Sequence, residues 1–126
     1  TCALPISDEA KALKAQLIRM ADGRQVNLVL TTGGTGFSPR DITPEATCAV
    51  ADRNAPGIAE AMRYHSLSIT PRGMLSRGVS VLRGKTLIVN LPGSPKAVQE
   101  NLEYILPSLE HGVRIAAGLD GECARK

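Results

Sequence analysis

The 126-residue sequence predicts an α/β fold built as one layered domain over residues 1–126. Helical and strand-like hydrophobic patterns alternate along the chain without an internal repeat, and two strand-like stretches are joined by a loop of hairpin length. Hydrophobic residues make up 43% of the chain and charged residues 21%, a composition that favours a packed core over a disordered chain.

Signals for helix starts, helix ends and strands place the expected elements along the chain. About three strands are visible, which is few for a sheet covered on both faces. In chain order the elements are a helix from Ser7 up to Gly23, a strand over 27–31, a helix from Thr43 to about Asn54, a short helix over about 57–64, strands over 79–82 and 86–90, and a helix from Ser94 to about Gly118.

Cap residues and prolines mark the helix starts. Ser7 precedes two acidic residues, which suit the positive first turn of a helix. Thr43 and Ser94 are each followed by proline, whose fixed φ favours the first helical position, so we expect both to be caps. Pro107 is expected to kink or restart the last helix, and residues 119–126 are expected to form a loose tail.

The strands differ in their sequence patterns. Residues 27–31 are nearly all apolar, as in a strand that is buried on both faces of a parallel sheet. Residues 79–82 and 86–90 flank Arg-Gly-Lys at 83–85, which predicts a β-hairpin. Residues 66–77 contain proline and glycine, and are expected to form an irregular or functional loop.

Composition argues against several classes of function. The chain has no Trp, one Phe and two Tyr, too few aromatic rings for a platform that stacks single-stranded nucleic acid. No run approaches the roughly 20 apolar residues of a membrane helix. Cys2, Cys48 and Cys123 show no metal-ligand spacing, so we expect reduced thiols in a cytoplasmic protein.

The net charge is only +3, but basic residues gather between Glu60 and Glu100, a window without a carboxylate. Such a local excess of positive charge suits an anionic ligand. A phosphate-type ligand and a plain basic surface explain it about equally well. The basic residues of this window are Arg63, Arg72, Arg77, Arg83, Lys85 and Lys96.

The loop over 32–36, Thr-Gly-Gly-Thr-Gly, joins the strand over 27–31 to the next helix. Glycines in such a loop let backbone N–H groups approach phosphate oxygens, and the helix start adds favourable partial charge. The loop lacks the Lys of a Walker A motif, and Pro39 stands where a dinucleotide fingerprint needs glycine. The alternative is a tight turn that needs glycine for backbone geometry alone.

Two further features extend this candidate site. Asp41 follows the loop, where a magnesium ion between the carboxylate and phosphates would explain it. A helix cap or a pair with Arg40 would explain it equally well. The turn over 90–94 repeats the strand–glycine–helix order, and Lys96 beyond it opposes the helix dipole unless an anion binds there. Nucleophilic catalysis is poorly supported, because the chain contains no GxSxG elbow.

Residues 31–47, TTGGTGFSPRDITPEAT, closely resemble the signature of the molybdopterin adenylyltransferase family, which includes stand-alone bacterial enzymes and the catalytic domain of gephyrin. The resemblance runs from about Ser7 to Gly118. It implies a three-layer α/β/α sandwich with a mostly parallel sheet, in which the hairpin is inserted, and usually a trimer. Further matches, in the family's order and spacing, are residues 55–57, 74–77, 83–85 and 90–96.

The resemblance implies a role in molybdenum cofactor biosynthesis. The terminal phosphate of molybdopterin would attack the α-phosphate of Mg-ATP, and pyrophosphate would leave. Asp41 would be a catalytic carboxylate associated with the metal. Asp8 matches a second family acid, although a first-turn helix acid explains it equally well. The expected nucleotide-binding residues are Thr32, Gly33, Gly34, Thr35 and Gly36, and the expected pterin-binding residues are Ser76, Arg77, Pro92, Gly93, Ser94 and Lys96.

Family members carry a further strand–helix unit before the point where Ser7 begins to match, and residues 1–6 supply only part of one strand. We therefore expect a domain truncated at its N-terminus. The alternative function is a non-catalytic molybdopterin-binding or scaffold domain of the same fold. The expected partners are molybdopterin, ATP, two further copies in a homotrimer and a downstream molybdotransferase, with no nucleic acid and no membrane.

Overall fold

Four β-strands form one mixed sheet in the computed structural model, which describes the backbone of residues 4–119 and the side chains of residues 9–119. The strand order is β1 (Leu28–Thr32), β4 (Thr86–Leu91), β3 (Ser80–Arg83) and β2 (Arg53–Asn54). β1 runs parallel to β4, whereas β4 with β3 and β3 with β2 are antiparallel. The predicted hairpin is therefore confirmed, and its two strands form the middle of the sheet.

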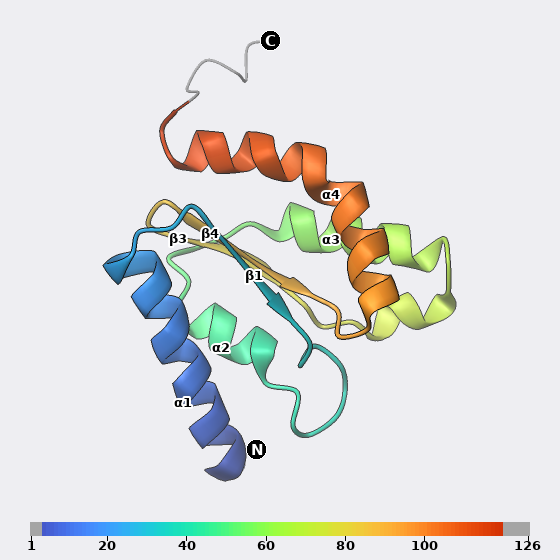
Figure 1. Cartoon of the computed structure of the whole chain (residues 1–126). Helices are drawn as coiled ribbons and strands as arrows, with labels where there is room; N and C mark the ends of the chain where they lie inside the picture. The colour runs from blue at the N-terminus through green and yellow to red at the C-terminus, as the bar shows by residue number, and fades with distance from the viewer. Residues whose placement is uncertain (1–3, 120–126) are drawn as a thin grey trace.

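Helices cover both faces of this sheet (Figure 1). One face carries α1 (Leu4–Ile18), which a π-helical turn over Arg19–Gly23 extends, and α2 (Thr43–Ala49). The other face carries α3 (Pro56–Leu67) and α4 (Pro95–Ala116). The predicted α/β fold class, with helices in layers on both sides of the sheet, is confirmed. The described sheet is mixed and not mostly parallel, because the hairpin and β2 add two antiparallel pairings to the one parallel pairing.

The hydrophobic core is organised around β4, the central strand, in which every residue is buried. Because side chains alternate along a strand, β4 contributes to a cluster on each face of the sheet. The cluster against α3 and α4 contains Met62, Leu87, Val89, Leu91, Ile105 and Leu109, and the opposite cluster contains Leu17, Val29, Val50, Val81 and Ile88.

β1 is less buried than its sequence predicts. Val29 is buried, but Leu30 is 38% exposed, so the expectation of a strand buried on both faces is wrong. The physical reason is its position, since within residues 4–119 β1 pairs with β4 on one side and lies at the edge of the sheet.

Two helix boundaries also differ from the prediction. The first helix begins at Leu4, with Pro5 in its first turn, where the missing N–H of proline costs nothing. Ser7 therefore lies inside the helix and does not precede it. The second helix ends at Ala49, several residues early, because residues 53–54 leave the helical path to pair with β3.

The last helix agrees with its sequence signals. Ser94 caps it, because the Ser94 hydroxyl oxygen accepts a hydrogen bond from the Ala97 N–H at 3.1 Å. Pro107 lies inside α4 without breaking it, and the ribbon bends in the middle of this helix (Figure 1). Of the expected tail, residues 120–126 lie outside the described part of the chain.

The chain ends contribute a further difference. The part-strand expected in residues 1–6 is not formed by residues 4–6, which are helical, while residues 1–3 lie outside the described residues. The short helix expected over about 57–64 is longer and reaches Leu67, and a 3-10 turn over Pro71–Leu75 follows it.

A buried amide holds the carboxyl end of β4. Asn90 is 2% exposed, and its Oδ1 accepts a hydrogen bond from the Val79 N–H at 3.0 Å. Its Nδ2 donates to the hydroxyl of Thr31, at the end of β1, and to that of Thr47 in α2, both at 3.0 Å. One side chain thus ties together two strands, a helix and the segment that leads into β3.

Asn90→Ala should lower the free energy of unfolding by about 3 kcal/mol, because the partly buried Val79 N–H and two hydroxyls lose their partner. Urea unfolding measures this change. The matched control is Asn54→Ala, since Asn54 is exposed and its replacement should cost within about 0.5 kcal/mol. Equal losses in the two variants would show that the amide network does not hold the sheet end.

Candidate functional site

The two glycine turns predicted from the sequence lie side by side. They follow β1 and β4, whose carboxyl ends meet at one edge because the strands are parallel. The Gly33 N–H donates to the Leu91 carbonyl oxygen at 3.1 Å. A Cβ built on Gly93 would lie 3.4 Å from the Gly33 Cα, so the two backbones are in close contact.

The first turn needs its glycines for geometry. Gly33 and Gly34 have φ values of +84° and +70°, in the left-handed region that favours glycine. A Cβ on Gly34 would lie 2.2 Å from the Thr43 Oγ1, closer than atoms can approach. The tight-turn interpretation is therefore correct for this pair, and phosphate binding by the same loop stays a prediction.

Asp41 does not serve the fold in either of the ways considered from the sequence. The residue before α2 is Ile42, which makes no side-chain cap, so neither Asp41 nor Thr43 caps this helix. Asp41 Oδ2 accepts from the Ser38 N–H at 2.9 Å, closing a turn within the loop. Within the described residues no ion pair joins Asp41 to Arg40, and Oδ1 accepts no hydrogen bond, so this oxygen has capacity for a ligand or a cation.

Arg77 reaches from the segment after the 3-10 turn into the glycine loop. Its Nε donates to the Gly36 carbonyl at 2.7 Å, and one Nη donates to the Asp41 carbonyl at 2.7 Å. Its other Nη forms an ion pair with a Glu45 oxygen at 2.5 Å. The hydrogen bond from Arg77 lowers the pKa of Glu45 below its usual value, so Glu45 stays ionised at neutral pH.

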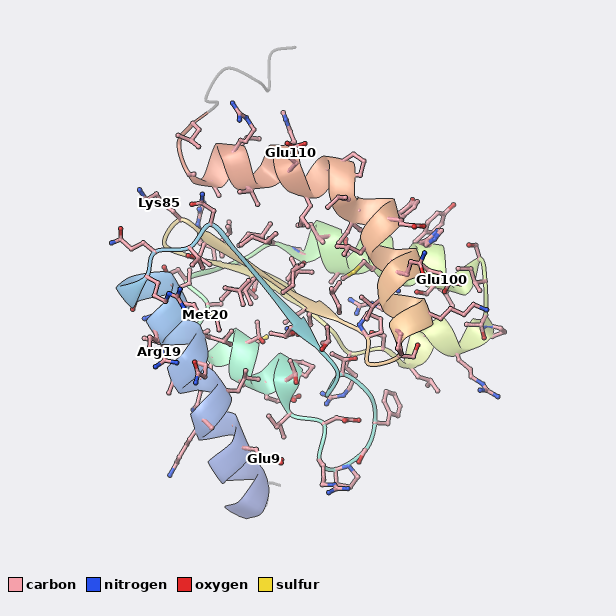
Figure 2. The ribbon with its side chains drawn as sticks, in the orientation of Figure 1. Glu9, Arg19, Met20, Lys85, Glu100 and Glu110 are labelled. Carbon is pink, nitrogen blue, oxygen red and sulfur yellow. The ribbon has the colours of Figure 1, made fainter. Side chains whose placement is uncertain are left out.

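The basic window therefore does not form one positive field. Arg63 donates to the carbonyls of Ser76 and Gly78, at 3.3 and 2.8 Å. Arg83 pairs with the carboxylate of Asp22 at 2.7 Å, on the strand end opposite the glycine turns. Lys85 stands beside Arg83 in the hairpin, also away from these turns (Figure 2). Arg63, Arg77 and Arg83 thus direct their guanidinium groups at other parts of the protein. Lys85 lies far from the glycine turns (Figure 2).

The second turn presents fewer internal contacts. Ser94 and Lys96 are exposed at the start of α4. Pro92 and Ser76 come together at a small cavity of about 30 Å³, which Asn90 also lines. The structure thus brings together several residues of the expected pterin set.

The positions of the remaining predicted residues say less about ligand binding. Thr32 is exposed at the end of β1, and Thr35 is buried with its carbonyl accepting from the Arg77 N–H at 2.7 Å. Asp8 lies in α1, and its side chain is outside the described part of the structure.

Sequence reasoning missed three residues that build the site: Glu45, Arg63 and Asn90. Asn90 carried a signal, because an amide in an otherwise apolar strand must find buried partners. Glu45 carried none, and Arg63 was noted only for its charge, since the partners of both residues are far away in sequence.

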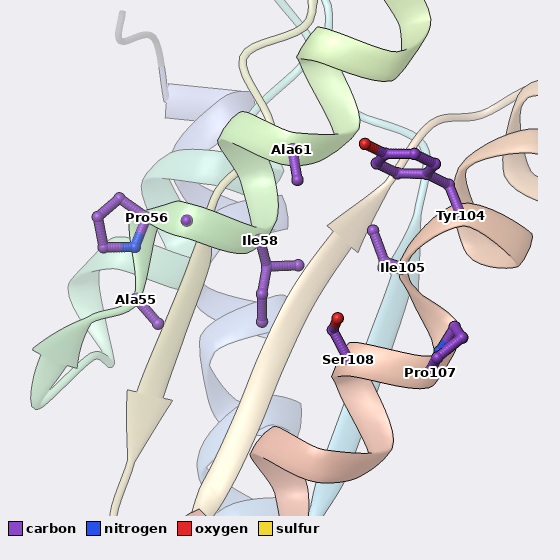
Figure 3. A pocket seen from close by; sticks show the side chains of 9 residues that line it. Ala55, Pro56, Ile58, Ala61, Tyr104, Ile105, Pro107 and Ser108 are labelled. Carbon is purple, nitrogen blue, oxygen red and sulfur yellow. The ribbon is translucent and has the colours of Figure 1, made fainter. Parts of the chain in front are cut away.

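A large apolar cavity lies elsewhere, between α3 and α4. It measures about 730 Å³ and is lined by side chains such as Ile58, Tyr104 and Pro107 (Figure 3). None of its lining residues is charged, so it is unsuited to phosphates. Within the described residues, no three His, Cys, Asp or Glu side chains gather to hold a metal ion by themselves. No helix in the same part of the chain is long and apolar enough to span a membrane.

Comparison with known proteins gives consistent results. Residues 3–111 match the model of a family described as a probable molybdopterin binding domain. The chain is 45% identical over 113 residues to a molybdopterin adenylyltransferase of Helicobacter pylori, covering 90% of this chain and 64% of that protein. It is 51% identical over 100 residues to the Escherichia coli K12 protein of the same name, covering 79% of this chain and 51% of that protein.

Among solved structures, the molybdopterin biosynthesis enzyme MoaB of Thermus thermophilus superimposes with a TM-score of 0.82 at 51% identity. The match covers 88% of this chain and 70% of that one. The chain thus spans between half and two thirds of the length of these curated relatives.

Gly34→Ala should destabilise the protein by about 2 kcal/mol or more, because alanine disfavours a positive φ and its Cβ would collide with Thr43. Thermal and urea unfolding measure the loss. Gly57→Ala is the matched control, since no atom lies within 4 Å of a Cβ built there, and it should be neutral or slightly stabilising. An unchanged melting temperature for Gly34→Ala would contradict the geometric role of this turn.

Proposed function

Since the chain belongs to the family of probable molybdopterin binding domains, we propose that it acts in molybdenum cofactor biosynthesis as a molybdopterin adenylyltransferase. The observation that carries the proposal is the pair of glycine turns in contact at one sheet edge, with the Asp41 carboxylate beside the first. Two relatives that bear this enzyme's name support it.

In the proposed reaction, a terminal phosphate oxygen of molybdopterin forms a bond to the α-phosphorus of ATP. The bond from that phosphorus to the oxygen bridging the α- and β-phosphates breaks, and pyrophosphate leaves with the electron pair. No oxidant, reductant or covalent protein intermediate is needed. The protein therefore contributes position and charge stabilisation, which backbone N–H groups in the glycine turns and Lys96 can supply.

Magnesium fits the residues at this site. Mg²⁺ held together with substrate phosphates needs only one or two protein carboxylates, and Asp41 offers an oxygen with capacity for a cation. Bound there, the ion would neutralise charge that develops on the phosphate oxygens. Asp41 is then the carboxylate whose role is to hold the metal beside the nucleotide.

The two turns have separate roles in this proposal. Residues 32–36 hold the nucleotide phosphates, and the second turn, with Ser76, Pro92, Gly93, Ser94 and Lys96, holds the molybdopterin phosphate. The contact between the turns supports this division, because transfer requires the two phosphates to meet. A homotrimer, a downstream molybdotransferase and a cytoplasmic location belong to the same proposal.

Asp41→Asn tests the catalytic role. Asparagine can still accept from the Ser38 N–H, so the loop should keep its shape while the charge is lost. We expect turnover to fall about 100- to 1,000-fold with little change in ATP affinity. Pyrophosphate release with molybdopterin, ATP and magnesium measures the rate, and calorimetry measures binding.

Asp52→Asn is the matched control. The Asp52 carboxylate also accepts a backbone N–H, that of Gly84 at 2.7 Å, but at the hairpin end of the sheet. Its replacement should leave turnover unchanged. If Asp41→Asn stays within about threefold of the wild type, or about 0.6 kcal/mol at the barrier, the non-catalytic binding or scaffold function is the better assignment.

Lys96→Ala should weaken molybdopterin binding about tenfold and ATP binding much less, because a charge-assisted contact at the second turn is lost. Ser94→Ala should act in the same direction, but it also removes the cap of α4 and should lower the melting temperature. Lys85→Ala, at the far hairpin, is the control. Calorimetry with both ligands together tests the division, since mutual exclusion would mean that the two turns form one site.

A further inference from the structure

We propose that Arg77 is a positioning residue, which clamps the loop over 36–41 and thereby sets Asp41, and that it does not bind a phosphate. The sequence grouped Arg77 with phosphate-binding residues, and its contacts point to a different role. The catalytic role of Asp41 rests on the proposed function, whereas the hydrogen bonds of the clamp do not depend on it.

The donors of the Arg77 guanidinium are directed to protein acceptors. Nε donates to the Gly36 carbonyl and Nη2 to the Asp41 carbonyl, each at 2.7 Å. Nη1 donates to Glu45 Oε2 at 2.5 Å, and Nη2 also lies 3.4 Å from Glu45 Oε1. Four of the five N–H donors are thus directed to protein acceptors, so a phosphate held by two N–H groups of Arg77 would have to displace existing hydrogen bonds.

The two carbonyls that Arg77 binds bracket the segment that carries Asp41. A guanidinium is planar and rigid, so its two bonds fix the distance between the Gly36 and Asp41 backbones. The Asp41 carboxylate depends on this distance, because Oδ2 lies 2.9 Å from where a Cβ on Gly36 would stand. The backbone N–H of Arg77 adds a third tie, to the Thr35 carbonyl at 2.7 Å.

Glu45 completes the clamp from α2. It lies in the first turn of that helix, where a negative charge is favourable, and its carboxylate compensates the charge of Arg77. The charge of Arg77 is therefore paired with Glu45, whereas an arginine that binds phosphate needs its charge available to the ligand. The clamp therefore joins three segments: the glycine loop, α2 and the chain after the 3-10 turn.

Arg77→Lys is the decisive variant, because lysine keeps the charge but cannot span two carbonyls and a carboxylate with one planar group. We expect kcat to fall roughly 10- to 100-fold through misplacement of Asp41, with KM for ATP and molybdopterin within about threefold. Glu45→Gln should also lower kcat, to a smaller extent. A phosphate-binding Arg77 predicts the reverse pattern: a raised KM in Arg77→Lys, and a lowered KM in Glu45→Gln, which would free the guanidinium.

Hydrogen exchange provides a readout that does not need activity. The amides of Ser38 and Asp41 are hydrogen-bonded within the clamped loop, so they should exchange faster in Arg77→Lys. Arg83→Lys is the matched control, since Arg83 also joins a carboxylate, that of Asp22, to a carbonyl, that of Val50. It should change neither these amides nor kcat.

The outcomes separate the two proposals. Faster exchange confined to residues 36–41 supports the clamp even if the wild type transfers no adenylyl group, a result that would overturn the proposed function alone. Unchanged exchange in Arg77→Lys overturns the clamp, whatever the activity. A raised KM with unchanged kcat also overturns it and returns Arg77 to direct ligand binding.

Discussion

The buried amide of Asn90 is the constraint on which the arrangement of both turns depends. It lies near the carboxyl end of β4, where the second turn begins, and its side chain bonds to β1, to α2 and to the segment before β3. A polar group in so apolar an environment is tolerated only when its hydrogen bonds are made, so the three partners are held in one arrangement around β4. The contact between Gly33 and the second turn follows from this arrangement.

Three arginines of this protein, Arg63, Arg77 and Arg83, serve as internal support. Arg63 and Arg77 direct their guanidinium groups at backbone carbonyls around the candidate site, and Arg83 does the same at the opposite end of the sheet. Loops that carry function lack the regular hydrogen bonds of helices and strands, so their carbonyls need other donors. A rigid group with five N–H donors meets this need, so three arginines of the basic window are held by contacts within the protein.

Some residues of the candidate site are required by the fold, and others are not. Gly34 is required by its positive φ and by the nearness of Thr43. Asp41, by contrast, neither caps α2 nor pairs with Arg40 within the described residues. Its carboxylate closes an exposed turn by accepting from the Ser38 N–H, and a neutral side chain could accept the same hydrogen bond. A charged group that the fold does not need, next to two turns suited to anions, is the observation that favours placing the proposed chemistry at this edge of the sheet.

The sequence by itself determined the order and type of most elements, the hairpin, the Ser94 cap and the placement of two glycine turns at neighbouring strand ends, but it placed residues 53–54 in a helix. These features are encoded within a few residues, by caps, prolines, glycines and hydrophobic period. The family resemblance was also readable, because its motifs are local.

Only the tertiary structure decided the rest. The second helix ends at Ala49 because residues 53–54 pair with β3, and Leu30 is partly exposed because β1 lies at the sheet edge. Arg77 meets Glu45 across 32 positions of sequence, and Arg83 meets Asp22 across 61. Such pairings form only when the chain closes on itself, and no local preference records which distant carboxylate or carbonyl a given arginine will meet.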